Sequence, residues 1–354
     1  MLSYMSAKEA AEKWNISQRR VAILCSENRI KGAMMVGKMW IIPSNAEKPI
    51  DKRTVLYEKQ KHVELKPFVK WVGGKGQLLE QLEQYIPQDD KNITKYAEPF
   101  VGGGALLFNV LSKYNFENIY ISDINKELMN AYEVVKNDVD ELISRLTEMQ
   151  LAFIPMDENG RKYFYYTARD KFNALKITTE TAIEKAALFI FLNKTCFNGL
   201  YRVNKKGQFN VPMGAYKNPT ICDENNLRNV SEALQNVTIV CGDYTLSKDF
   251  IDKDTFVYLD PPYRPISDTA GFTAYNTDCF DDNEQIRLAK FIDEINSKGA
   301  KLVLSNSDPK NVNPEDNFFE ELYKKYTINS VEATRAINSK GDSRGKIKEL
   351  LICN

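Results

Sequence analysis

Histidine is nearly absent from this 354-residue sequence, which contains only His62. That scarcity disfavours chemistry that depends on a histidine base, including most Ser-His and Cys-His triads. The six cysteines are scattered and form no Cys-x-x-Cys pair, so we expect no metal site and interpret them as reduced thiols of a cytoplasmic protein. No apolar run approaches the ~18 residues of a membrane span, and the N-terminal residues are too polar for a secretion signal. The chemistry must therefore use carboxylates, backbone groups or a cofactor.

Net charge gives no guide to a partner, because Lys and Arg together number 48 and so do Asp and Glu. Acidic residues are missing, however, from Lys185 to Cys222. This stretch predicts a surface that contacts phosphates, and a solvated basic loop is the alternative. Its basic residues are Lys185, Lys194, Arg202, Lys205, Lys206 and Lys217.

The first fifty residues, 1–50, have the pattern of a separate module. Ser6 followed by Glu9 forms a capping box that predicts a helix at 7–14, and a second helix is expected at 18–30. An alternating segment at 32–43 predicts a hairpin. Two helices and a hairpin outline a winged helix-turn-helix that binds DNA, whereas a cap on the main domain or a dimerisation element is the alternative. The recognition helix would open with Gln18, Arg19 and Arg20.

Residues 51–65 are polar and charged, and we interpret them as a linker. Beyond them, short apolar runs alternate with amphipathic segments, which predicts an α/β domain with a mainly parallel central sheet. Because strand-like runs are missing for about a hundred residues in the middle, we expect residues 66–135 and 237–354 to form this domain and 136–236 to form a helical insertion. The five expected strands lie at 95–100, 118–123, 237–243, 255–260 and 300–306.

Ligands of such sheets bind beyond the carboxyl ends of the strands. After the first expected strand, glycines from Gly102 to Gly104 open a helix and let the backbone come close to a ligand. Asp123, about 20 residues later, can accept hydrogen bonds from ribose hydroxyls, and Asp243 is placed to meet the attached base. These features predict a nucleoside-containing cofactor, with a plain turn and a helix cap as the alternatives. The glycine spacing departs from the GxGxxG of dinucleotide sites, which disfavours an oxidoreductase.

The fourth expected strand ends in Asp260, Pro261, Pro262 and Tyr263. Two prolines directly after a buried strand end the ladder and fix φ, so the carbonyl groups there point in set directions. A carboxylate, an oriented carbonyl and an aromatic face suit an exocyclic amino group on a planar base. Asp260 and the Pro261 carbonyl would accept its two N–H bonds, while Tyr263 stacks on the ring.

With these motifs in place, the chain resembles the Dam-type DNA N6-adenine methyltransferases, in their α-group motif order. The resemblance covers about residues 66–354 and leaves the first fifty residues outside. It implies a Rossmann-like class I methyltransferase sheet with a helical target-recognition insertion. The matching segments are 68–75, 98–104, 123–125, 198–200, 209–212, 260–263 and 271–275.

The resemblance implies S-adenosylmethionine as the cofactor. Lys75 would lie near its methionine carboxylate, and the face of Trp71 would lie near its sulfonium cation. Core packing is the alternative for Trp71, and a solvent-exposed charge is the alternative for Lys75. The cofactor-binding residues implied by the resemblance are Trp71, Lys75, Glu98, Phe100, Gly102, Gly104, Asp123, Asp243 and Asp260.

Double-stranded DNA is the implied substrate, and an adenine flipped out of the helix is methylated directly on N6. Arg202 matches the family's base-reading arginine, Phe197 an aromatic residue that enters the base stack, and Lys70 a lysine that reads the outer base pair. GATC, the commonest target in the family, is implied, with two departures from the pattern: residues 194–196 read Lys-Thr-Cys, and Ala215 stands in place of arginine. The expected DNA contacts of the catalytic part are Lys70, Lys194, Phe197, Asn198, Leu200, Arg202, Lys205, Lys206, Pro212 and Lys217.

The main alternative is a helix-turn-helix transcription regulator whose methyltransferase-like domain senses S-adenosylmethionine without catalysis. The intact segment 260–263 and Asp123 argue against it, since a sensor does not need the catalytic tetrapeptide. The sequence leaves open whether a restriction endonuclease accompanies the enzyme and which purpose methylation serves.

Overall fold

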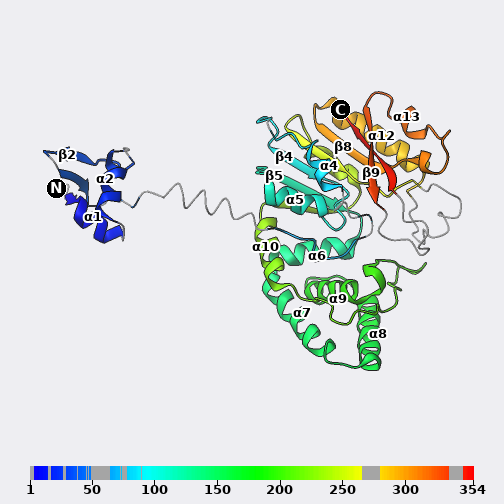
Figure 1. Ribbon diagram of the computed structural model, residues 1–354. Coiled ribbons are helices and arrows are strands. Elements are labelled where there is room, and N and C mark those ends of the chain that lie inside the picture. Colours follow the sequence, from blue (N-terminus) through cyan, green and yellow to red (C-terminus); the bar gives the residue numbers. More distant parts are fainter. Residues whose placement is uncertain are drawn as a thin grey trace. The chain divides into compact units, whose positions relative to one another are not determined.

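The computed structural model describes residues 4–14, 17–26, 29–37, 39–44, 46, 48, 64–71, 73, 78–88, 90–264, 280–334 and 346–354. The chain divides into two compact units, Met1–His62 and Val63–Asn354, which are described separately (Figure 1). Within the described ranges no helix is both long enough and apolar enough to cross a membrane.

The N-terminal unit contains two short helices and a three-stranded antiparallel sheet in the order β1-β3-β2. The capping box forms as expected: the Ser6 backbone N–H donates to the Glu9 carboxylate at 2.7 Å, and the Glu9 backbone N–H donates to Ser6 Oγ at 3.3 Å. The second helix ends at Ser26, earlier than predicted, and strand β1 was not anticipated. The elements are β1 (Tyr4–Ser6), α1 (Ala7–Trp14), α2 (Gln18–Ser26), β2 (Met34–Val36) and β3 (Met39–Pro43).

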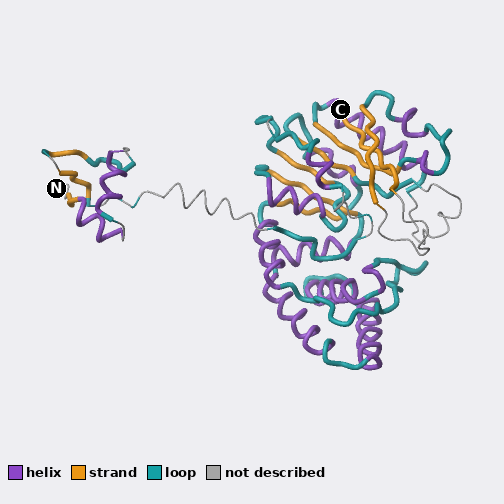
Figure 2. The backbone as a smooth tube through the Cα atoms, in the orientation of Figure 1, coloured by secondary structure: helices purple, strands orange, loops and turns teal. Residues whose placement is uncertain are grey.

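The larger unit is built on a seven-stranded sheet in the order β6-β5-β4-β7-β8-β10-β9 (Figure 2). The five predicted strands are the five that run parallel, which confirms an α/β fold with a mostly parallel central sheet. Strand β10 is antiparallel to both of its neighbours, β8 and β9, and neither β9 nor β10 was predicted. The strands are β4 (Lys95–Glu98), β5 (Asn118–Asp123), β6 (Val237–Cys241), β7 (Thr255–Leu259), β8 (Lys301–Ser307), β9 (Thr327–Thr334) and β10 (Lys346–Cys353).

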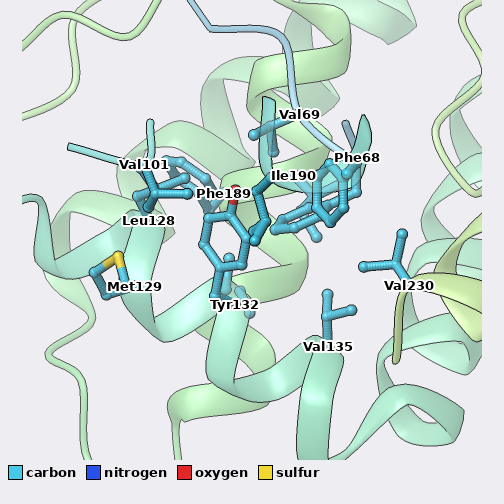
Figure 3. Close-up of a cluster of buried hydrophobic side chains, with 14 of the residues drawn as sticks. Phe68, Val69, Val101, Leu128, Met129, Tyr132, Val135, Phe189, Ile190 and Val230 are labelled. Atoms are coloured by element: carbon cyan, nitrogen blue, oxygen red, sulfur yellow. The ribbon is translucent and has the colours of Figure 1, made fainter. Parts of the chain in front are cut away.

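Numbered along the chain, the parallel strands have the order 3-2-1-4-5, which is the order of a Rossmann sheet. The order reverses between β4 and β7, so these neighbouring strands flank the switch point where ligands of such sheets bind. Both faces of the sheet are covered, because adjacent residues of β4 belong to different hydrophobic clusters: Tyr96 to one and Ala97 to the other. Phe68, Tyr132 and Phe189 lie in the larger cluster (Figure 3).

The stretch expected as an insertion contains helices α7, α8 and α9, which lie together beyond the sheet (Figure 1). Helix α6 ends at Asn137 and α7 begins at Val139, so the chain passes from the sheet domain into the insertion at Asp138. Helix α9 is buried almost all round, so it forms the centre of the insertion. The helices of this unit are α4 (Leu79–Glu83), α5 (Ala105–Lys113), α6 (Lys126–Asn137), α7 (Val139–Phe153), α8 (Glu158–Ala174), α9 (Ala182–Thr195), α10 (Glu224–Leu234), α12 (Asp282–Ser297) and α13 (Phe318–Leu322).

Candidate active site

The glycine turn after β4 has a backbone that requires glycine. Gly102 and Gly104 have φ angles of 49° and 74°, in the left-handed region. A Cβ atom on Gly102 would lie 2.8 Å from Trp71 Cδ1, and one on Gly104 would lie 2.5 Å from Tyr132 Oη. The turn therefore packs tightly against two aromatic side chains.

Asp123, at the end of β5, is joined to this turn. Its Oδ2 accepts a hydrogen bond from the Gly102 N–H at 3.1 Å, and its Oδ1 accepts one from the Asn125 N–H at 2.9 Å. Burial raises the pKa of the Asp123 carboxyl, while these backbone hydrogen bonds lower it. The cap of α6 is Asn125, whose side chain accepts from the Leu128 N–H, so the helix-cap interpretation of Asp123 is wrong. The structure thus brings two predicted cofactor residues together.

Trp71 lies between the glycine turn and the insertion. Its ring stacks on Tyr201 at a centroid distance of 5.6 Å and an interplanar angle of 22°, and it lies 6.4 Å from the ring of Phe189. The Trp71 side chain is half-buried, so it is both a packing residue and partly accessible. Tyr201, which was not predicted, donates a long hydrogen bond of 3.4 Å to Glu127.

Asp243 follows β6 and is held by an arginine that the sequence did not reveal. Arg287 of α12 donates to both of its oxygens, from Nη2 to Oδ1 at 2.8 Å and from Nη1 to Oδ2 at 3.0 Å. Burial raises the pKa of Asp243, but the hydrogen bonds from Arg287 and Thr245 outweigh it, and the net pKa is lowered. Beside it, the ring of Phe100 lies 5.1 Å from that of Tyr244.

The segment 260–263 is fixed by three other elements. Ser305 Oγ of β8 donates to Asp260 Oδ1 at 3.0 Å. The Tyr263 hydroxyl donates to Glu349 of β10 at 2.6 Å. Gln285 of α12, which is fully buried, donates to the Pro262 carbonyl at 3.3 Å. Each of these residues is distant in sequence, and together they hold the tetrapeptide in one conformation at the end of β7.

Glu98, at the end of β4, lies close enough to the segment 260–263 for the charge of Asp260 to affect its pKa. It is buried and accepts a hydrogen bond from the Tyr96 hydroxyl at 2.7 Å. Burial raises the pKa of Glu98 to about 8; the hydrogen bond from Tyr96 opposes this rise, and the negative charge of Asp260 adds to it. Glu98 is therefore mostly neutral at pH 7, which limits charge repulsion beside Asp260.

The segment before Trp71 is tied to the insertion by Asn193, a buried residue of α9 that was not predicted. Asn193 accepts from the Lys70 N–H at 2.7 Å and donates to the carbonyls of Lys70 at 2.8 Å and Gly199 at 3.1 Å. Gly199 has a φ of 63°, and a Cβ there would lie 2.4 Å from Lys70 Cδ. The Lys70 ammonium lies 4.1 Å from the ring centroid of Tyr216. Lys70 therefore belongs to the same surface as the residues that follow α9.

The residues after α9 form an exposed loop surface. Phe197 is 52% exposed, and Asn198 beside it has a φ of 54°. A short hairpin follows, in which Arg202 Nε donates to Asn210 Oδ1 at 2.8 Å. Lys205 and Lys206 lie exposed at its turn, where the Lys206 N–H donates to Asn204 Oδ1 at 2.9 Å. Pro212 and Lys217 are also exposed, and Leu200 is half-buried.

Two lysines of the acid-free stretch are less exposed than the others. Lys185 is buried, and its ammonium donates to the Phe172 carbonyl at 2.7 Å and lies 3.8 Å from Glu127. Lys194 is half-buried, and burial together with the charge of Lys70 lowers its pKa. Lys185, which was not among the expected DNA contacts, therefore belongs to the interior of the insertion.

The family model for the D12 class N6 adenine-specific DNA methyltransferases matches residues 71–337 of this chain. The chain belongs to this family.

Three relatives are similar to this methyltransferase along nearly their whole length. M.MjaIII, a type II methyltransferase of Methanocaldococcus jannaschii, is 54% identical, over 82% of this chain and 100% of that protein. M1.LlaDCHI, a type II methyltransferase of Lactococcus lactis subsp. cremoris, is 38% identical, over 84% of this chain and 98% of that protein. The DNA adenine methylase of Escherichia coli K12 is 34% identical, over 80% and 93%. The chain is thus an adenine-specific DNA methyltransferase.

Among solved structures, a putative RNA methyltransferase from Pyrococcus horikoshii is similar with a TM-score of 0.32 and 8% identity, over 85% of this chain and 97% of that chain. This similarity is too low to carry an argument about function. The N-terminal unit lies outside the residues that the family model matches.

Lys75 and the segment 271–275 lie outside the described residues, as does the side chain of Arg20. Gln18 and Arg19 are exposed in the first turn of α2. Within the described part of the chain, no group of His, Cys, Asp and Glu side chains is arranged to hold a metal ion.

Proposed function

We propose that this methyltransferase transfers the methyl group of S-adenosylmethionine to N6 of an adenine that is flipped out of duplex DNA. The observation that carries the proposal is the fixed conformation of Asp260 and Pro261 at the switch point of the sheet, beside Glu98 and the glycine turn. Two observations support the proposal: the chain belongs to a family of adenine-specific DNA methyltransferases, and Asp260 follows a strand that flanks the switch point of the sheet.

The residues around the glycine turn fit S-adenosylmethionine. When bound, this cofactor supplies an activated methyl group. Asp123 would hold the ribose hydroxyls, because each of its oxygens accepts one backbone hydrogen bond and retains capacity for another. Asp243 would accept from the adenine amino group, and the half-buried face of Trp71 would lie near the sulfonium cation. Lys75 would complete the site near the carboxylate, and Gly102 and Gly104 leave no side chain in the way.

Asp260 and the Pro261 carbonyl would accept the two N–H bonds of the target amino group. The nitrogen lone pair is delocalised into the ring, and these hydrogen bonds favour a more tetrahedral nitrogen that is a better nucleophile. Fixed geometry then supplies rate by proximity and by oriented charge. The Tyr263 ring would stack on the base, with its hydroxyl held by Glu349. Pro262 lies between these residues in the segment, and its carbonyl accepts a hydrogen bond from Gln285.

The test uses duplex DNA without adenine methylation and a cofactor labelled in its methyl group. We expect label in N6-methyladenine, and we expect Asp260→Ala to abolish transfer while DNA binding stays within about threefold, since truncating one side chain in the pocket leaves the phosphate contacts in place. Binding of cofactor and DNA by the wild type without any transfer would instead support the sensing regulator. Near-normal turnover by the Asp260→Ala variant would contradict the role of this carboxylate.

The exposed loop surface would recognise the DNA. Phe197 would enter the stack beside the flipped base, which its 52% exposure supports. Arg202 would bind guanine, and Leu200 and Pro212 would contact a thymine methyl group. The phosphate contacts would come from the lysines of the surface together with Lys194, and the base contacts from Lys70 and Asn198. The proposed target is GATC, and sequencing the methylome of a methylation-free host that expresses this chain would test it.

Two further roles are proposed. The relatives named type II methyltransferases support a restriction endonuclease as a partner of this enzyme. The N-terminal unit would act as a winged helix-turn-helix that binds DNA through Gln18, Arg19 and Arg20, as its two helices and antiparallel hairpin suggest.

A further inference from the structure

Two buried hydroxyl groups lie in series behind Asp260. Ser305 Oγ, which is fully buried on β8, lies 3.0 Å from Asp260 Oδ1. Tyr258 Oη, which is buried on the neighbouring strand β7, lies 2.9 Å from Ser305 Oγ. Strands β7 and β8 pair in parallel, so Tyr258 and Ser305 come from adjacent strands, and Asp260 directly follows the end of β7.

The direction of both hydrogen bonds follows from the number of protons. An ionised carboxylate only accepts, so the single hydroxyl proton of Ser305 goes to Asp260. Ser305 Oγ then has no proton left for Tyr258, and the Tyr258 hydroxyl must be the donor in the second bond. Both hydrogen bonds therefore point the same way: Tyr258 donates to Ser305, and Ser305 donates to the Asp260 carboxylate.

We propose that Ser305 is a positioning residue for Asp260 and that Tyr258 acts on Asp260 through Ser305. The inference rests on the proposed function of Asp260 as the acceptor for the target amine. A hydrogen bond to an ionised acceptor is stronger than a neutral one, so rotation of the carboxylate away from Ser305 is costly. The Tyr258 ring is packed in the hydrophobic core and can move little. The two hydrogen bonds therefore restrict the motion of the Asp260 carboxylate as well.

A purely structural role would give a different pattern of defects. If the two hydroxyls only satisfied each other's hydrogen-bonding needs, their loss would lower stability and leave the rate of methyl transfer in the folded enzyme unchanged. Loss of positioning lowers the rate of the chemical step and spares the binding of DNA and cofactor. Displacements of about 1 Å at a reacting centre cost on the order of 100-fold in rate.

The test measures the single-turnover rate of adenine methylation, and the dissociation constants of DNA and S-adenosylmethionine, for the full chain. We expect Ser305→Ala to lower the rate by roughly 10- to 100-fold, with both dissociation constants within about threefold of the wild type. Tyr258→Phe should lower the rate by a smaller factor, roughly three- to tenfold, because Ser305 still donates to Asp260. Ser231→Ala is the matched control, since Ser231 is a buried serine on α10 whose Oγ donates to the Lys136 carbonyl.

The double variant decides whether the two residues act in series. If Tyr258 acts only through Ser305, the Ser305→Ala/Tyr258→Phe variant has the rate of Ser305→Ala within about twofold. A double variant that loses the product of the two single losses would overturn the series, and a Ser305→Ala rate within threefold of the wild type would overturn the positioning role. Should Ser305→Ala fail to fold, an unchanged rate in Tyr258→Phe overturns the proposal by itself. Absence of adenine methylation in both the wild type and Ser231→Ala would point to failure of the proposed function instead.

Discussion

At the residue scale, the proposed catalytic site combines two carboxyl groups in different surroundings. Asp260 accepts a hydrogen bond from Ser305, whereas Glu98 is buried with Tyr96 as its donor. Burial raises the pKa of Glu98 to about 8, so a proton stays on this residue at neutral pH. The neutral acid lets the site hold one negative charge without a second one beside it.

Glu98 should make the stability of the protein depend on pH in a specific window. Its pKa in the folded state, about 8, lies above its ordinary value of 4.5, so the folded state binds the proton more tightly than the unfolded state. The resulting contribution is fully present below pH 4.5 and is lost as pH rises toward 8. Relative to Glu98→Gln, which cannot titrate, we expect the free energy of unfolding of the wild type to fall by roughly 1 kcal/mol per pH unit in this window. Urea unfolding at several pH values measures it.

The exposed Glu117→Gln variant is the control for the Glu98 experiment. It should follow the wild-type stability curve across the same pH range. Parallel curves for Glu98→Gln and the wild type would show that Glu98 does not hold its proton in the folded protein.

Arg202 and Lys206 should affect DNA binding in different ways. Arg202→Ala should reduce the preference for the target over a changed guanine position by about 1–3 kcal/mol, because the proposed bidentate contact to guanine is lost. Lys206→Ala should weaken binding to all sequences alike and lower the slope of log K against log salt by about 0.9. Binding measured at several salt concentrations on target and altered duplexes separates the two. Equal losses on both duplexes for Arg202→Ala would contradict base reading.

At the scale of elements, the glycine turn between β4 and α5 is constrained by its neighbours. Gly104 has a φ of 74°, and a Cβ there would lie 2.5 Å from Tyr132 Oη and 2.9 Å from Phe108 Cε2. Gly207, in the turn of the exposed hairpin, has a nearly equal φ of 73° with nothing within 4 Å of its Cβ position. A comparison of substitutions at Gly104 and Gly207 therefore separates the cost of the left-handed backbone from the cost of a steric clash.

Gly104→Ala should destabilise the protein more than Gly207→Ala. We expect about 1–2 kcal/mol from the left-handed backbone in each variant, and a further 1–3 kcal/mol from overpacking in Gly104→Ala alone. Denaturant unfolding of both variants gives the comparison. If the two variants lose equal stability, the packing of Tyr132 and Phe108 against the turn is looser than the structure indicates.

The sequence predicted the strand ends better than the contacts that hold them. Short apolar runs precede each of these strand ends, namely Asp123, Asp260 and the glycine turn that begins at Gly102. Such runs can be recognised within a short stretch of sequence. The residues that fix them come from far along the chain: Tyr263 and Glu349 are 86 positions apart, and Asp243 and Arg287 are 44 apart. No local pattern marks such pairs.

The two unpredicted strands have a similar explanation. Strand β9 is an edge strand with the sequence TINSVEAT, in which polar residues outnumber the aliphatic ones. Strand β10 begins with alternating charged residues and resembles a solvent-exposed segment, although it lies between β8 and β9. Their strand character comes from pairing within the sheet and is weak in the segments themselves.

At the scale of the whole molecule, the two units predict separable functions. The family model covers residues 71–337, so the catalytic machinery belongs to the larger unit. Deletion of residues 1–50 should weaken DNA affinity or change site preference, because the proposed DNA-binding module is removed, and it should spare methyl transfer. Affinity and methylation rate on the same duplex give the measurement. Loss of methylation on every substrate would contradict this separation.

The antiparallel strand β10 determines what happens when the protein is produced as two separate fragments. Asp260 and Tyr263 lie in the part of the chain before residue 265, while Glu349, which receives the Tyr263 hydroxyl, lies on β10. A break between α13 and β9 yields two fragments, and neither contains all the residues of the proposed catalytic site together with Glu349. Methylation would then return only when the fragments reassemble, which makes this position suitable for a split reporter that records the meeting of two fused proteins as a lasting mark on DNA.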